Sequence, residues 1–141
     1  MTQELDPELV NAYEATLFTV QLPSGSVLFG VGQAPLGDIR SLGTRPLTVI
    51  TAYNPGSERP DEAQNRAANE RLRQTLIARG TQYHDAVGQS ADRSHSEPSF
   101  AVPDLTEQQA HELGLEFDQA CVFYWTGKLG KLLWCTEGEP P

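Results

Sequence analysis

The segment from Leu47 to Tyr53 constrains the fold more than any other part of the chain. Its apolar side chains alternate onto both faces of an extended strand, with Leu47, Val49 and Tyr53 on one face and Ile50 and Ala52 on the other. A strand that is apolar on both faces is covered on both sides, because a half-exposed strand would alternate apolar with polar residues. The segment therefore predicts a central strand within a layered domain.

The elements expected after this strand have the order of an α+β domain. A proline at residue 60 suits the first turn of a helix, which we expect to extend to Arg79. Thr106 begins a capping-box pattern for a second helix, which we expect to end at Gly114. Strands are expected at 82–87, 99–102, 120–125 and 129–135.

The first six elements of this order match the split βαβ plan of ferredoxin-like folds. We therefore predict an α+β fold: a mostly antiparallel sheet with helices packed on one face, widened by an N-terminal hairpin and a C-terminal strand. One domain is expected over residues 1–141. Its predicted parts are a helix and hairpin at 4–31, a loop at 32–46, the α+β core at 47–135 and a frayed tail at 136–141.

Polar residues gather where the central strand ends. A turn signal extends from Asn54 to Ser57. In the helix that follows, Asn65 and Asn69 share one stripe with two leucines that must face the sheet. A buried amide is destabilising unless it is paired. We favour the interpretation that these amides form a clasp that ties down the turn, and the alternative is that they bind a ligand.

The ligand interpretation names five binding residues at this strand end: Tyr53, Asn54, Ser57, Asn65 and Asn69. His95 and Glu97 lie two residues apart in a loop expected at 88–97, and they are weak candidates for an acid/base pair. The sequence does not show that this loop approaches the strand end. The histidines are far apart and no metal or nucleotide motif occurs, so we expect no metal and no cofactor.

The formal net charge of −9 argues against a nucleic-acid partner, because the phosphate backbone requires a lysine- and arginine-rich surface. It leaves a basic protein as a candidate partner. No stretch approaches the length of an apolar membrane span, and the acidic N-terminus lacks the pattern of a signal peptide. We therefore expect a cytoplasmic protein that does not enter a membrane.

The C-terminal hairpin carries two further features. Trp125 and Trp134 belong to an aromatic region that we expect to lie mostly in the core, and an exposed tryptophan there would mark an interaction surface. Cys121 and Cys135 flank the hairpin, so the strand register decides whether they face each other. Two buried free thiols are the favoured interpretation.

An ordered set of motifs resembles a known bacterial family. The motifs are Thr51-Ala52-Tyr53-Asn54-Pro55, Asn65 and Leu72, Gly80, Gly88, Glu97-Pro98-Ser99-Phe100, Leu113-Gly114 and Val122-Phe123-Tyr124-Trp125. Over residues 47–135, this set is similar to the family catalogued as domain of unknown function 3293. The resemblance implies a small bacterial protein with no assigned activity. It groups Tyr53, Asn54, Asn65, Glu97 and Ser99 without giving any of them a chemical role.

Two classes of function fit these observations. The favoured one is a protein-interaction or regulatory module, which agrees with the acidic charge and with the absence of a catalytic motif, and which allows self-association. The alternative is a domain that binds a small polar ligand, or an enzyme, with its site between the strand at 47–53 and the start of the helix at 60–79. We lean against an enzyme, because acid/base chemistry needs a convergent set of residues.

Overall fold

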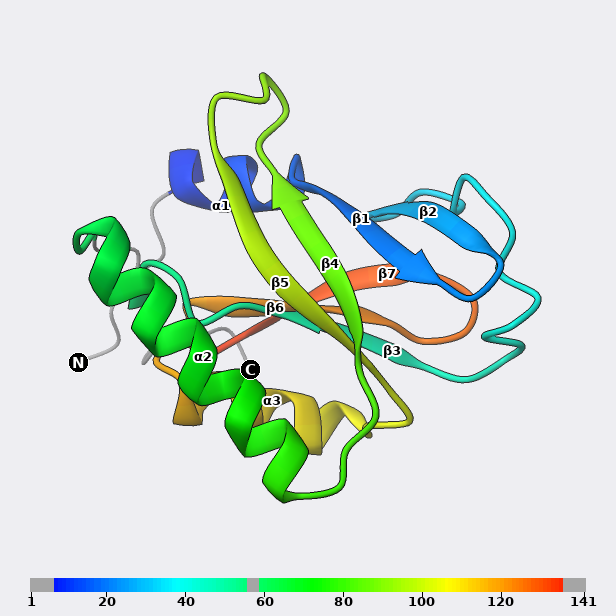
Figure 1. The fold of residues 1–141 in the computed structure, drawn as a ribbon. Coiled ribbons are helices and arrows are strands. Elements are labelled where there is room, and N and C mark those ends of the chain that lie inside the picture. Colours follow the sequence, from blue (N-terminus) through cyan, green and yellow to red (C-terminus); the bar gives the residue numbers. More distant parts are fainter. Residues whose placement is uncertain (1–6, 56–58, 136–141) are drawn as a thin grey trace.

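A computed structural model describes residues 7–55 and 59–135 of the protein (Figure 1). The elements follow in the order α1 (Pro7–Glu14), β1 (Leu17–Leu22), β2 (Gly25–Gly30), β3 (Leu47–Ile50), α2 (Glu62–Ala78), β4 (His84–Gln89), β5 (Ser96–Pro103), α3 (Glu107–Glu116), β6 (Cys121–Trp125) and β7 (Gly130–Trp134). The predicted α+β class is confirmed. The predicted tail at 136–141 and the start of the N-terminal helix lie outside the described residues.

The seven strands form one sheet in the order β2-β1-β4-β5-β3-β6-β7, and every neighbouring pair is antiparallel. The sheet curls so strongly that its two edges approach each other. Just beyond β2, the Gly32 N–H donates to the carbonyl oxygen of Gly130 on β7 at 3.0 Å. Because the curl and the added strands distinguish this sheet from a simple four-stranded plan, the ferredoxin-like description stays a prediction.

The curl divides the apolar interior into two clusters. One cluster fills the concave side of the sheet, and its largest members are Phe29, Leu47, Phe123 and Trp125. The other lies between the convex side and the helices α2 and α3, and it includes Ile50, Leu72, Leu76, Val102 and Leu113. All four residues of β3 are buried, as a central strand requires.

The helices occupy both sides of the sheet. The helices α2 and α3 share one face of the sheet, as predicted, and this is its convex side (Figure 1). The short helix α1 instead lies at the concave side, where Tyr13 packs edge-on against Trp134 of β7 with 5.6 Å between ring centroids. The expectation that helices pack on one face therefore applies to α2 and α3 only.

Several predicted boundaries are wrong for identifiable reasons. The β4–β5 hairpin is longer than expected, so Glu97 lies on a strand, paired with Gly88, and not in a loop. Asp61 caps α2 in a capping box with Gln64, which places Pro60 before the helix. Gly114 lies inside α3, where the absence of a side chain serves packing and does not end the helix: a Cβ there would lie 2.6 Å from the Cys135 sulfur.

The register of β6 and β7 separates the two cysteines. Cys121 is paired with Trp134, so Cys135 lies one residue out of register on the opposite face. The two cysteines form no disulfide with each other, and Cys135 is buried as expected, whereas Cys121 is half-buried. None of the helices within the described ranges is long and apolar enough to cross a membrane.

Candidate functional site

Asn69 ties the end of β3 to the neighbouring strand β5. Its Oδ1 accepts a hydrogen bond from the backbone N–H of Ala52 at 2.9 Å. Its Nδ2 donates to the carbonyl oxygen of Pro98 at 3.2 Å. These bonds explain why the strand pairing of β3 stops at Ile50, because the backbone of the next residues is held by a side chain of α2.

Asn65 makes a second connection one helical turn earlier. The Asn54 N–H donates to the Asn65 Oδ1 at 2.9 Å, and the Asn65 Nδ2 donates back to the Asn54 Oδ1 at the same distance. This pair of bonds stabilises Asn54 in a left-handed conformation, with φ of 50°. The geometry of Asn65 and Asn69 is that of the clasp favoured from the sequence.

The clasp directs Asn54 toward Glu97. With its Oδ1 held by Asn65, Asn54 uses its Nδ2 to donate to the Glu97 Oε2 at 2.6 Å. The strand end and the His95–Glu97 region, whose proximity the sequence left open, therefore meet in the structure. The contact joins residues that are 43 positions apart in the chain.

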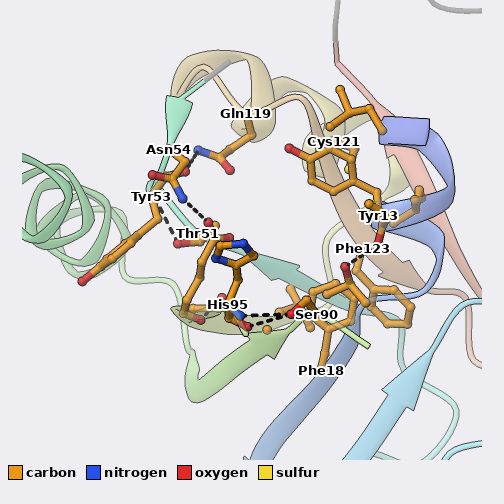
Figure 2. A pocket seen from close by; sticks show the side chains of 18 of the residues that line it. Tyr13, Phe18, Thr51, Tyr53, Asn54, Ser90, His95, Gln119, Cys121 and Phe123 are labelled. Atoms are coloured by element: carbon orange, nitrogen blue, oxygen red, sulfur yellow. Dashed lines mark hydrogen bonds between the residues drawn. The ribbon is translucent and has the colours of Figure 1, made fainter. Parts of the chain in front are cut away.

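Beside this contact lies a cavity of about 220 Å³ on the concave side of the sheet (Figure 2). A cavity of roughly 150 Å³ is large enough for a benzene-sized molecule, so this one has room for a small organic compound. The polar lining includes Thr51, Asn54, Glu97, Ser99 and Gln119. The apolar lining is formed by Leu9, Ala12, Phe18, Val49, Phe123 and Leu132.

Glu97 is the half-buried acidic group of this cavity. Removal of its carboxyl from water raises its pKa above the ordinary value, and this effect outweighs the opposing influence of the Asn54 hydrogen bond and of the nearby His95 and Arg59. A carboxyl group with a raised pKa inside a cavity is a common feature of functional sites.

His95 and Arg59 lie at the exposed rim of the cavity. The Nη2 of Arg59 is 3.2 Å from the Nε2 of His95. His95 and Glu97 line the same cavity without a hydrogen bond between them, so their role as an acid/base pair stays a prediction.

A comparison of the sequence with models of known protein families identifies the family of this chain. Residues 50–122, more than half of the chain, match the family DUF3293, described as a protein of unknown function. The chain belongs to the DUF3293 family. We found no match among curated proteins and none among solved structures.

The DUF3293 segment contains the polar side of the cavity but little of the apolar side. Asn54, Glu97 and Gln119 fall within residues 50–122, whereas α1, Phe18, Phe123 and Leu132 fall outside this range. The family segment therefore supplies the clasp and the acidic group, and the flanking segments close the cavity around them.

The other predicted site residues have different positions. The ring of Tyr53 points away from the cavity, and its hydroxyl donates to the Glu62 Oε1 at 2.8 Å (Figure 2). Asn65 and Asn69 do not line the cavity. Ser57 lies outside the described residues. Trp125 is only 3% exposed and packs against Phe29, which does not fit a role at an exposed surface.

Sequence reasoning missed Gln119 and the cavity-lining role of Cys121. Gln119 stands between an exposed aspartate and an alanine, where nothing in the pattern marks it. Cys121 and Phe123 alternate onto the face of Trp125, so strand periodicity was the signal that could have found them. Leu9 and Tyr13 of α1 lie four residues apart and share one face of the helix, but this spacing does not show where on the sheet that face packs.

Proposed function

We propose that the protein binds a small molecule in the cavity beside Glu97. The observation that carries this proposal is a half-buried carboxyl group, held by a single amide donor, in a cavity large enough for a ligand. A structural carboxylate at such a position would normally be surrounded by donors that compensate its desolvation. The incomplete set of partners is consistent with a ligand that supplies the remainder.

The shape and lining of the cavity support the same function. Small-molecule sites are concave, mostly apolar and equipped with a few fixed polar groups. Here Phe18 and Phe123 pack together with 4.8 Å between ring centroids and present an aromatic wall to the cavity. The clasp fixes the polar side, because Asn54 is bonded on one side to Asn65 and on the other to Glu97. This arrangement orients the carboxyl group before any ligand arrives.

The interaction module that the sequence favoured stays a prediction with less support. Burial of Trp125 removes one of its two aromatic candidates, and Trp134 is half-buried under Tyr13. A basic protein partner, self-association, cytoplasmic location and bacterial origin also stay predictions.

NMR spectroscopy of the isotope-labelled full chain tests the proposed function. We would add benzyl alcohol, phenethylamine or isovalerate and record amide shifts. At least one probe should shift Gly88, Ser99 and Cys121 together, since these residues line different sides of the cavity. If none of the probes shifts these amides at millimolar concentrations, the proposal is wrong.

Two variants of α1 provide a matched control. Ala12 is exposed and lines the cavity, whereas its neighbour Asn11 is exposed and does not. Ala12→Trp should therefore block the cavity and abolish the shifts, and Asn11→Trp should leave them unchanged. Equal binding by both variants would place the probe elsewhere on the protein.

A further inference from the structure

We propose that the ligand of the Glu97 cavity carries a primary ammonium group next to an apolar substituent. This inference rests on the proposed function and assigns the chemical class of the ligand. It follows from a comparison of the hydrogen-bond donors and acceptors along the polar lining. Most donors are already used within the protein, and the acceptors that remain are oxygens.

The hydroxyl and amide donors of the lining are committed to protein acceptors. Thr51 donates to the Pro98 carbonyl at 2.7 Å, and Ser99 donates to the Glu97 carbonyl at 3.0 Å. Asn54 donates to the Glu97 carboxylate, and Ser90 donates to the Asp92 carboxylate at 2.8 Å. A ligand that needs donors from these four residues would have to break these bonds.

Gln119 leaves an acceptor in the cavity. Its Nε2 donates to the carbonyl oxygens of Tyr53 at 3.2 Å and of Phe117 at 3.3 Å. Two carbonyl partners require the NH₂ end of the amide, so the Oε1 must be the other end. This oxygen points into the cavity and has no hydrogen-bond partner among the described residues (Figure 2). The residue is only 9% exposed, so the cavity is the natural source of a donor.

Glu97 leaves the second acceptor. Asn54 bonds to its Oε2, and its Oε1 has no hydrogen-bond partner within the described part of the chain. An ammonium group has three donors and a positive charge. It can satisfy several oxygens at once and restores the charged form of a carboxyl group that burial disfavours. A neutral alcohol has one donor and no charge, and a carboxylate has neither donor nor favourable charge.

The charges and apolar groups around the cavity refine this class. Besides Glu97, the titratable or charged groups in the lining are Tyr13, Tyr53, Arg59, His95 and Cys121. Arg59 is exposed at the rim, where it contacts His95, so it does not neutralise Glu97 by direct contact. The apolar wall fits an alkyl or aryl substituent. An amine and an α-amino acid can both present an ammonium group next to an apolar substituent. The carboxylate of the amino acid would face Arg59 at the rim.

Calorimetric titrations with four probes test the inference: phenethylamine, phenethyl alcohol, 3-phenylpropionate and L-phenylalanine. At neutral pH, phenethylamine should bind at least about tenfold more tightly than phenethyl alcohol, because a charge-assisted bond replaces a neutral one. Tighter binding of L-phenylalanine than of phenethylamine would assign an amino acid, and weaker binding would assign an amine. Both results support an ammonium ligand.

Variants assign the effect to Glu97. Glu97→Gln should remove the preference for the amine over the alcohol. Asp85→Asn, which removes an exposed carboxylate on β4 outside the cavity, should keep it. The unaltered chain gives an independent readout. At mildly acidic pH, amine binding should release protons from Glu97, detected as a dependence of the binding heat on the buffer.

The two proposals fail in different ways. If the alcohol or the carboxylate binds in the cavity as tightly as the amine, or if amine binding releases no proton, the ammonium assignment is wrong and the ligand site remains. If none of the four probes binds in the cavity, the proposed function itself is wrong.

Discussion

Replacement of Asn69 by alanine tests whether the clasp stabilises the fold. The variant would leave the N–H of Ala52, which bonds to the Asn69 Oδ1 at 2.9 Å, buried without a partner. An unpaired buried donor destabilises by about 1–3 kcal/mol, and loss of the bond to the Pro98 carbonyl adds about 1 kcal/mol. The higher helix propensity of alanine offsets roughly 0.5 kcal/mol. We expect a net loss of about 1.5–3.5 kcal/mol.

Urea unfolding, followed by tryptophan fluorescence, measures this change. Gln74→Ala is the matched control, because it removes an amide from the exposed face of the same helix and should change stability by less than about 0.5 kcal/mol. If Asn69→Ala is as mild as this control, the clasp does not stabilise the strand end, and the explanation given for the polar half of the helix stripe is wrong.

Three further changes test other parts of the structure. Glu97→Gln should increase the free energy of unfolding at neutral pH, because the raised pKa of Glu97 means that folding disfavours its ionised form. The increase should vanish when the pH falls below the ordinary carboxyl pKa. A variant that is less stable at neutral pH would contradict this. Burial raises the pKa of the Cys121 thiol, so a thiol reagent should modify it slowly in the native protein and rapidly in denaturant, whereas equal rates would contradict its burial. Gly130→Ala should destabilise the protein by about 1–3 kcal/mol in urea unfolding. The added methyl group would lie 2.6 Å from the Phe123 ring and 2.8 Å from the Gly30 carbonyl oxygen. Unchanged stability would show that the sheet edges can separate.

Local patterns predicted the fold class and most elements. The apolar strand at Leu47, the capping box at Thr106 and the alternation in the terminal hairpin each depend on neighbours within a few residues. The curl of the sheet could not be predicted in this way. It depends on contacts such as the one between Gly32 and Gly130, which are far apart in the chain.

The candidate site was predicted in part for the same reason. The asparagine stripe broke an apolar pattern, and this local conflict correctly marked Asn65 and Asn69 as residues with special partners. It could not show that the partners lead to Glu97, because β3 and β5 become neighbours only through the sheet order. Gln119 was missed because its position is defined by two backbone carbonyls and not by a periodic pattern.

A carbon-13 NMR titration of the Glu97 carboxyl group, with and without phenethylamine, tests the central claim most directly. Because the carboxyl group is removed from water and has one hydrogen-bond donor, Asn54, its pKa in the free protein should lie above the ordinary value. Binding of the ammonium group should lower it, since the ligand stabilises the ionised form. An ordinary pKa that does not respond to the amine would contradict both the desolvated cavity and the ligand that we assign to it.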